Sequence, residues 1–137
     1  MLAAAPQPVH EKVAFDADTL FDFDKSVLRP AGRDTLDAFV KNMRGVDFKS
    51  IVAVGHTDRL GSTRYNQNLS EERVAAVKTY LISKGIESGQ LRTSGMGETQ
   101  PMTKAGECRG SLSSRLIACL QTDRRVEIEV SGSRLKQ

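Results

Sequence analysis

The sequence contains no tryptophan, only two cysteines and few aromatic residues (5%). It also has no apolar run near the roughly 20 residues that a membrane-spanning helix requires. Hydrophobic residues make up 39% and charged residues 27% of its 137 positions, a composition typical of a globular domain. A chain of this length usually forms one domain and buries about two-thirds of its unfolded surface. We therefore expect it to fold without a metal or cofactor.

A basic tract interleaved with aromatic residues is missing too, although the net charge is +3 and the pI is about 9.0. The 20 Lys and Arg residues are scattered among 17 acidic ones. Proteins that bind single-stranded nucleic acid need a basic groove with aromatic side chains on which bases stack. We therefore expect no nucleic acid among the partners.

The two cysteines, Cys108 and Cys119, do not form a CxxC pattern, which argues against a redox or zinc motif. Two alternatives remain open. A disulfide would stabilise the fold by on the order of 3 kcal/mol and would place the domain in an oxidising compartment such as a periplasm. Two buried free thiols would instead fit a cytosolic protein.

The N-terminal residues MLAAA are too few and too uncharged for a signal peptide, so we expect the chain to be an excised part of a longer protein. Pro6 and Pro8 in an alanine-rich stretch predict a linker remnant over residues 1–10 that stays extended in water. The domain is predicted over residues 11–132, and a polar tail over residues 133–137.

Alternating apolar residues from position 11 onward predict a half-buried first strand, and Phe21 and Phe23 behind it predict an anchor in the core. The acidic residues of this stretch are Asp16, Asp18, Asp22 and Asp24. A calcium loop that began at Asp16 would need glycine and glutamate where Phe21 and Val27 stand. No metal site is therefore predicted.

The middle of the chain predicts a helix, a strand and a second helix. Pro30 and Gly45 bracket an apolar stripe and predict a helix over residues 30–44. Residues 50–56, SIVAVGH, are apolar on both faces and predict a central strand. Ser70 followed by two glutamates predicts the N-cap of the longest helix, which Gly85 ends.

The last third predicts a strand over residues 91–98, a short helix over 114–120 and an alternating final strand over 125–130. A strand, a long helix and a further strand form a βαβ unit, so the strands at 50–56 and 91–98 should be parallel. The carboxyl end of the first of these strands presents Asp58.

Arg73 borders the buried stripe of the long helix, so its guanidinium needs water or an anion. Helical side chains point toward the N-terminus, so Arg73 should lean toward the turn that carries Asp58. The two residues would then form either a plain salt bridge or a site for a zwitterionic ligand. His56 is near this turn, but no nucleophile motif accompanies it, which favours a packed histidine over a catalytic base.

Four segments together resemble the OmpA-like peptidoglycan-binding domains. They are GHTDRLGSTRYNQNLSEERVAAVKTYL at 55–81, LFDFDKSVLRP at 20–30, GMGETQP at 95–101 and DRRVEIEV at 123–130. The resemblance implies a βαβαβ sandwich of the α/β (α+β) class, with helices packed on a mixed sheet. It also implies a groove for the diaminopimelate of peptidoglycan stem peptides.

Carried over by position, the resemblance makes Asp58 and Arg73 the ligand residues, with Thr57 beside them. Asn66 shapes the same groove, and Arg124 borders it, although Arg125 competes for that role. The family pattern has Asn-Arg-Arg where this chain has Asp123 before the two arginines. Cys108 and Cys119 resemble the disulfide of the subgroup closest to this chain.

The resemblance implies a non-catalytic anchor in the periplasm of a Gram-negative bacterium, joining the outer membrane to the cell wall. The parent protein is expected to carry an outer-membrane barrel, and a homodimer remains open. One alternative is the same domain in a lipoprotein or a flagellar stator. A peptidoglycan hydrolase is disfavoured because HExxH and G-x-S-x-G motifs are absent.

Overall fold

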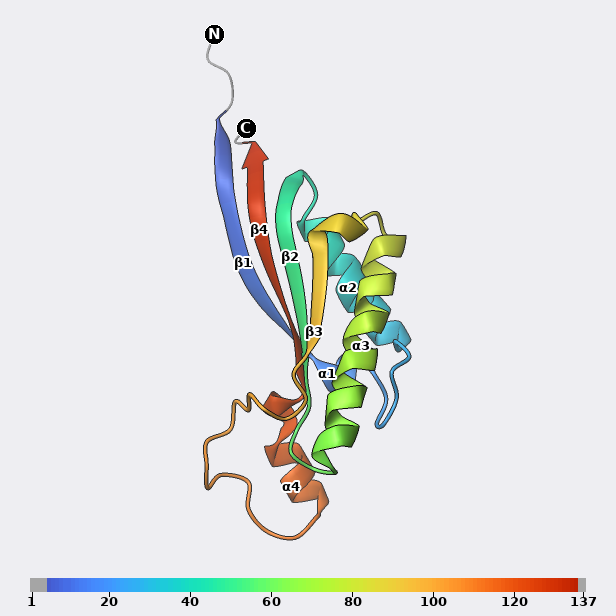
Figure 1. Ribbon diagram of the computed structural model, residues 1–137, viewed down its shortest axis with the longest axis vertical. Helices are drawn as coiled ribbons and strands as arrows, with labels where there is room; N and C mark the ends of the chain where they lie inside the picture. Colours follow the sequence, from blue (N-terminus) through green and yellow to red (C-terminus); the bar gives the residue numbers. More distant parts are fainter. Residues whose placement is uncertain (1–4, 136–137) are drawn as a thin grey trace.

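The computed structural model describes residues 5–135. In chain order its helices and strands are β1 (Pro6–Asp16), α1 (Ala17–Leu20), α2 (Pro30–Asn42), β2 (Val46–His56), α3 (Thr63–Ser83), β3 (Leu91–Gly95), α4 (Ser114–Cys119) and β4 (Arg125–Leu135). The strands form one sheet in the order β1-β4-β2-β3, and α2 and α3 lie on one face of it (Figure 1). The predicted mixed sheet covered by helices is confirmed.

The topology brings several strand ends to one rim of the sheet. β2 and β3 are parallel, as predicted, so their carboxyl ends at His56 and Gly95 lie together. β4 lies between β1 and β2 and is antiparallel to both. It therefore begins, at Arg125, where β1 ends and β2 ends. Residues that follow β1, β2 and β3, and those that precede β4, meet at this rim.

A single core between the sheet and the helices fixes this arrangement. Its most deeply buried apolar side chains are Leu20, Leu36, Ile51, Ala53, Val74, Val77, Leu81, Val126, Ile128 and Val130. Those of α2 and α3 come from the apolar stripes that the sequence predicts, and those of β2 and β4 alternate along the strands. No helix within residues 5–135 is long and apolar enough to cross a bilayer.

The outer strands reach beyond the predicted limits of the domain. β1 begins at Pro6 and pairs with β4 as far as Leu135, so residues 6–10 are not a free linker but part of the sheet. Residues 1–4 of the predicted linker and 136–137 of the predicted tail lie outside the described part of the chain. Hydrophobic alternation stops earlier because the outer ends pair through backbone groups while most of their side chains stay exposed.

The N-terminus predicted for the long helix is wrong. α3 begins at Thr63, and its N-cap is Ser62, whose hydroxyl accepts a hydrogen bond from the Tyr65 amide at 3.1 Å. Ser70 lies inside the helix, where it is buried and its Oγ accepts from the Gly97 amide at 2.9 Å. The first two turns of α3 face the rim and are therefore polar. In the sequence, such a run of polar residues predicts a loop, which is why the start of the helix was placed too late.

The predicted aromatic anchor is half correct. Phe21 is buried, whereas Phe23 is 90% exposed. Helix α1 interrupts the strand pattern at Ala17, and the backbone of Asp24 is left-handed, with φ of +65°. The chain therefore turns sharply between Phe21 and Leu28, which form an isolated antiparallel bridge, and Phe23 lies in this turn, outside the core.

Gly95 at the end of β3 allows α3 to approach the sheet. A Cβ atom there would lie 2.5 Å from the Glu71 amide nitrogen, which is backbone and cannot move aside. We expect Gly95→Ala to lower the free energy of unfolding by about 1 to 3 kcal/mol, measured by urea denaturation. Gly89→Ala is the matched control, because nothing lies within 4 Å of its added methyl group. Equal stability of the two variants would contradict this packing.

Candidate functional site

The turn after β2 presents Asp58 in a fixed orientation. The Thr57 amide donates to the Gly97 carbonyl at 2.9 Å, which ties the turn to the segment after β3. Asp58 Oδ1 accepts from the Leu60 amide at 2.9 Å, and the Thr57 hydroxyl donates to the Asp58 carbonyl at 2.9 Å. These bonds leave the second carboxylate oxygen, Oδ2, directed at other groups.

Asn66 supports this turn from α3. Its side chain is buried, and its Nδ2 donates to the Asp58 carbonyl at 3.2 Å, to the Leu60 carbonyl at 2.9 Å and to Glu98 Oε1 at 3.1 Å. Each of these acceptors belongs to the protein, so Asn66 shapes the turn through its backbone. The structure thus places Asn66 beside the turn that carries Asp58, and its predicted role in a ligand groove stays a prediction.

Arg73 is buried in α3 beside the turn that follows Phe21. Its Nε donates to the Lys25 carbonyl at 2.8 Å and its Nη2 to the Asp22 carbonyl at 3.1 Å, while the guanidinium carbon lies 5.1 Å from the Phe21 ring centroid. A guanidinium has five N–H donors, and within residues 5–135 those on Nη1 and the second on Nη2 have no hydrogen-bond partner and could serve another acceptor. Arg73 is therefore held in place with part of its fork free.

The salt bridge considered for Asp58 and Arg73 does not form within the described residues. Asp58 Oδ2 instead accepts from Arg124 Nη1 at 2.8 Å. Arg124 also clasps Asp18, with Nε at 3.1 Å from Oδ1 and Nη2 at 3.0 Å from Oδ2. One arginine thus bridges two carboxylates at the rim. Local sequence spacing favoured Arg73, but the antiparallel start of β4 brings Arg124 closer.

The structure also separates the roles of the two adjacent arginines. Arg124 points to Asp58, so of the two arginines it is the one that contacts the predicted ligand residue. Arg125 points elsewhere: its Nε donates to Glu127 Oε2 at 2.8 Å, its Nη1 to the Asp123 carbonyl at 3.1 Å and its Nη2 to the Gln100 carbonyl at 3.0 Å. Arg124 is the extended residue just before β4 and Arg125 is the first residue of that strand, and successive extended residues direct their side chains to opposite sides.

Two acidic residues of the site were not predicted. Asp18 binds Arg124, and both Asp18 and Asp24 raise the pKa of Arg73 against the larger opposing effect of burial, which lowers it. The sequence shows both as members of a row of aspartates near the first strand. No local signal separates them from solvated residues, because Asp18 and Arg124 lie 106 positions apart.

The charges at the rim balance one another. Burial lowers the pKa of Arg124, but its hydrogen bonds to Asp18 and Asp58 outweigh burial and raise it overall. Both arginines stay charged at neutral pH because a guanidinium titrates far above it. We call Asp18, Asp58, Arg73 and Arg124 the charge cluster. It can offer a carboxylate to a cation and a guanidinium to an anion at the same place.

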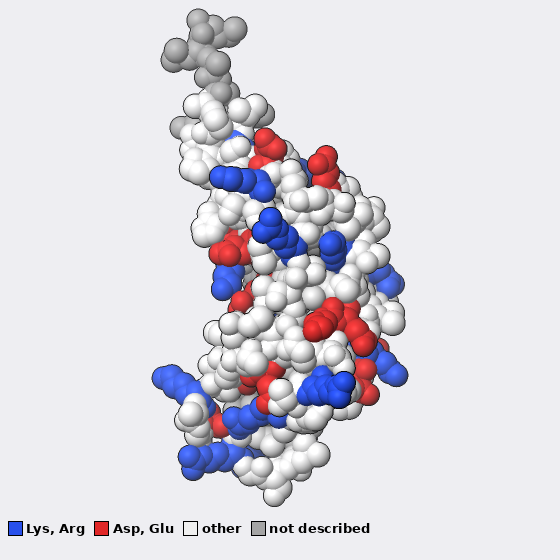
Figure 2. Space-filling model, in the orientation of Figure 1, with Lys and Arg blue, Asp and Glu red and all other residues white. Residues whose placement is uncertain are grey.

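Three members of the charge cluster, Asp58, Arg73 and Arg124, are largely buried, and Asp18 is the more exposed one. Two hollows of about 380 Å³ each lie away from it, toward the opposite end of the sheet, around Lys49, Arg92 and Gly132. Basic and acidic side chains are interspersed on the face shown in Figure 2. Within residues 5–135, no three His, Cys, Asp or Glu side chains gather as a metal site would require.

His56, one residue before Thr57, is buried on the other side of the rim. Its Nε2 lies 3.5 Å from Glu127 Oε1, and within the described residues neither ring nitrogen has a hydrogen-bond partner. Burial lowers the pKa of His56, Arg125 and Lys12 lower it further, and Glu127 opposes them. The neutral imidazole is therefore the form that the fold favours.

We expect the stability of the domain to fall as the pH drops below about 6.5, the pKa of an unfolded histidine. Between that pKa and the lower one of the folded state, unfolding takes up a proton at His56, so acid favours the unfolded chain. Urea denaturation between pH 5 and 7.5 measures the effect. His56→Asn should flatten the slope in this window, and an unchanged slope would contradict the assignment.

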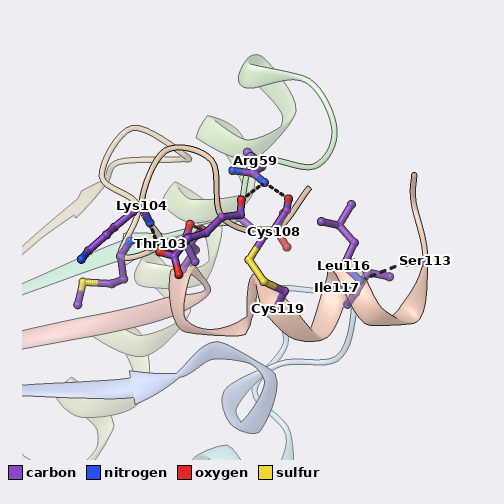
Figure 3. The surroundings of a disulfide bond; sticks show 12 residues. Arg59, Thr103, Lys104, Cys108, Ser113, Leu116, Ile117 and Cys119 are labelled. Carbon is purple, nitrogen blue, oxygen red and sulfur yellow. Dashed lines mark hydrogen bonds between the residues drawn. A yellow bond between two sulfur atoms is a disulfide. The ribbon is translucent and has the colours of Figure 1, made fainter. Parts of the chain in front are cut away.

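The disulfide implied by the resemblance is present. Cys108 in the long segment after β3 is bonded to Cys119 at the end of α4, next to the rim (Figure 3). The loop is also tied at its start, where Asp123 accepts from the amides of Met102 and Thr103, both at 2.8 Å. The segment that the sequence left without regular structure is therefore anchored at both ends.

The fold and the charge cluster define a two-layer α/β domain with a charged rim. A model of the OmpA family matches residues 20–111, which include Asp58, Asn66 and Arg73. The chain therefore belongs to the OmpA family, as the sequence motifs predict.

Curated relatives support this assignment. The chain is 45% identical over 129 residues to outer membrane protein A of Bordetella avium, covering 94% of this chain and 62% of that protein. It is 48% identical over 120 residues to outer membrane protein A of Salmonella typhi, covering 85% of this chain and 34% of that protein. The chain thus spans less than two-thirds of the length of these relatives.

Solved structures share the fold. The OmpA-like domain of FopA1 from Francisella tularensis is 25% identical, with a TM-score of 0.67 over 97% of this chain and 81% of that one. The cell wall anchor of the T6SS from Pseudomonas aeruginosa is 23% identical, with a TM-score of 0.72 over 94% of this chain and 87% of that one. The second likeness concerns the fold alone.

Proposed function

We propose that this domain binds peptidoglycan non-covalently, through the diaminopimelate of its stem peptides, and so tethers an outer membrane to the cell wall. The observation that carries the proposal is the charge cluster, of which Asp58 and Arg73 lie on the turn and helix within the segment that matches the family, while Asp18 and Arg124 reach the same rim from α1 and from the residue before β4. Family membership and the name of the relatives, outer membrane protein A, support a role in the bacterial envelope.

The ligand end of diaminopimelate matches the cluster in charge. It carries an ammonium and a carboxylate on one carbon atom. Asp58 Oδ2 can accept from the ammonium, and the free part of the Arg73 fork can donate two N–H bonds to the carboxylate. Thr57 and Asn66 hold the turn on which Asp58 lies. A zwitterion adds no net charge to a cluster of two acids and two bases.

Asp58 can leave Arg124 for the ligand ammonium at a small cost in free energy. Arg124 gives Asp58 only one of its N–H bonds and holds Asp18 through Nε and Nη2. When an ammonium arrives, Arg124 can stay on Asp18 while Asp58 turns to the ligand. The ion pair between Asp58 and Arg124 gives each of these charged groups a hydrogen-bond partner within the protein.

The affinity of one site should be modest. Hydrogen bonds between charged groups each contribute about 1.5 to 3 kcal/mol, so a single stem peptide should bind with a Kd of about micromolar to millimolar. Many copies held in a membrane opposite a polymer gain from their high effective concentration. Weak single sites are therefore compatible with a firm tether that still allows the wall to be remodelled.

The parent protein is proposed from the relatives. Their name favours an outer membrane protein in which this domain, whose sheet spans residues 6–135, is the periplasmic binding domain. The disulfide fits an oxidising periplasm. A parent of lipoprotein or flagellar stator type is the alternative, and the sequence upstream of this chain would distinguish them. A homodimer and a barrel in the parent also remain proposals.

We propose that the domain has no catalytic role. A peptidoglycan hydrolase would need a nucleophile or an activated water, but the charge cluster consists of carboxylates paired with arginines. Release of soluble fragments from purified sacculi, lost on replacing His56, would revive the hydrolase hypothesis.

The test compares two kinds of sacculi. Purified domain should sediment with sacculi that contain diaminopimelate. It should stay in the supernatant with sacculi whose stem peptides carry lysine, because lysine lacks the carboxylate meant for Arg73. Equal sedimentation with both would reject diaminopimelate as the determinant, and no sedimentation with either would reject wall binding.

A further inference from the structure

The disulfide joins two segments that each contact a neighbour of Asp58. The first is the loop that carries Cys108, and the second is α4, which ends at Cys119. The close-up in Figure 3 shows both segments beside Arg59. This arrangement places a covalent bond between two segments whose carbonyl groups bind Arg59 and Arg124.

Arg59 links the loop to the ligand turn. It follows Asp58 in the chain, and its Nη2 donates to the Glu107 carbonyl at 2.9 Å and also to the Cys108 carbonyl (Figure 3). Its side chain is therefore directed away from the charge cluster and toward the loop. The position of the turn and the position of Cys108 are coupled through these two bonds.

Arg124 links α4 to the same carboxylate from the other side. The Nη1 that donates to Asp58 also donates to the carbonyl of Ile117, at 3.0 Å, two residues before Cys119. The carbonyl of Cys108 itself accepts from Arg59, which follows Asp58 in the chain. The carbonyl of Ile117, two residues before Cys119, accepts from Arg124, which also binds Asp58. The disulfide completes the ring that runs from Arg59 through the loop and α4 to Arg124.

The loop has little else to hold its middle. Most of residues 104–113 are exposed, and Gly106, Cys108 and Gly110 all have left-handed backbone conformations. Its local hydrogen bonds connect Lys104 with Glu107, two residues of the loop itself. Segments with few buried contacts open locally at low free energy unless they are cross-linked.

We infer that Arg59 and the disulfide between Cys108 and Cys119 position Asp58 and Arg124 for the ligand, so that an intact disulfide raises the affinity of the site. This inference rests on the proposed function. It assigns Arg59 as a positioning residue that acts through the turn and has no contact with the ligand. The bound group remains the zwitterionic end of diaminopimelate.

Titration of the folded domain with meso-diaminopimelate, followed by amide NMR shifts, tests the inference. Dithiothreitol reduces Cys108 and Cys119 to thiols as it is oxidised to its cyclic disulfide. We expect the reduced domain to bind about threefold to tenfold more weakly, the loss expected when one hydrogen bond no longer holds the turn. Reoxidation should restore the affinity.

Arg59→Gln provides the same test without breaking the disulfide. It should weaken binding by a similar factor, and reduction of this variant should add little further loss, because both changes open the same ring. Arg115→Gln, an exposed arginine of α4, is the matched control and should bind as the wild type does. If Arg59 only stabilised the fold, the losses of affinity from Arg59→Gln and from reduction would not depend on each other in this way.

The outcomes separate the inference from the proposed function. Suppose that the reduced domain and Arg59→Gln both bind meso-diaminopimelate with the affinity of the oxidised wild type. The inference is then wrong, and the proposed function stands. Additive losses from Arg59→Gln and reduction would also overturn it. If the oxidised wild type binds neither meso-diaminopimelate nor sacculi, the proposed function fails first.

Discussion

Replacing Asp58 with asparagine is expected to weaken binding to diaminopimelate-containing sacculi about tenfold to hundredfold, the loss of one or more hydrogen bonds to a charged group. Asparagine keeps an oxygen that can accept from the Leu60 amide, so the turn should persist. The change removes the negative charge that the ligand ammonium requires. Sedimentation with sacculi, corrected for free protein, measures the loss.

The control for this variant is Asp34→Asn, because Asp34 is an exposed aspartate on α2, outside the charge cluster. It removes one negative charge and should leave sedimentation unchanged. Thermal unfolding of Asp58→Asn should also remain cooperative. If Asp58→Asn and Asp34→Asn sediment alike, Asp58 does not bind the ligand, and the proposed clamp is wrong.

Arg73→Lys is expected to weaken binding by about tenfold or more while the positive charge is kept. The guanidinium serves the Lys25 and Asp22 carbonyls with two donors and still has others for a carboxylate. A lysine ammonium is a point charge and cannot hold both carbonyls and a bidentate carboxylate. Calorimetric titration with meso-diaminopimelate measures the affinity.

The same change should lower the free energy of unfolding by about 1 to 3 kcal/mol, because a carbonyl in the turn after Phe21 loses its donor. Titrations therefore need a temperature at which the variant is fully folded. Arg92→Lys on β3 is the control, since Arg92 is exposed and lies outside the cluster. A folded Arg73→Lys domain with wild-type affinity would remove Arg73 from the site.

The central βαβ unit could be predicted because its hydrophobic pattern is local. Ile51 and Ala53 alternate into the core, and Val74, Val77 and Leu81 follow the helical period. The parallel pairing of β2 and β3 follows from the long helix between them. These features depend on neighbours in the chain, and a single sequence contains them.

The start of α3 could not be predicted because the site overrides helix propensity there. Asn66 and Ser70 are buried polar residues that bind the turn and the segment after β3. In the sequence, such residues indicate a loop or a cap. The burial of these polar residues in α3 therefore explains both errors: the N-cap was predicted at Ser70, and the contacts of Asn66 with the Asp58 turn were not predicted.

The partner of Asp58 depends on tertiary structure. Asp58 and Arg73 were named from one contiguous motif, but the ion pair joins Asp58 to Arg124, 66 positions away. The register of β4 between β1 and β2 brings Arg124 to the rim, together with Asp18. Spacing along the chain contains no information on that register, so the pairing of Asp58 with Arg124 could not be predicted from the sequence.

A crystal structure of the oxidised domain with bound meso-diaminopimelate tests the proposed clamp most directly. We expect one ligand ammonium within hydrogen-bonding distance of Asp58 Oδ2 and the carboxylate on the same carbon on the free N–H donors of Arg73. Arg124 should remain on Asp18. A ligand bound away from this rim, or one with its carboxylate placed on Arg124 and no contact with Arg73, would contradict the proposal.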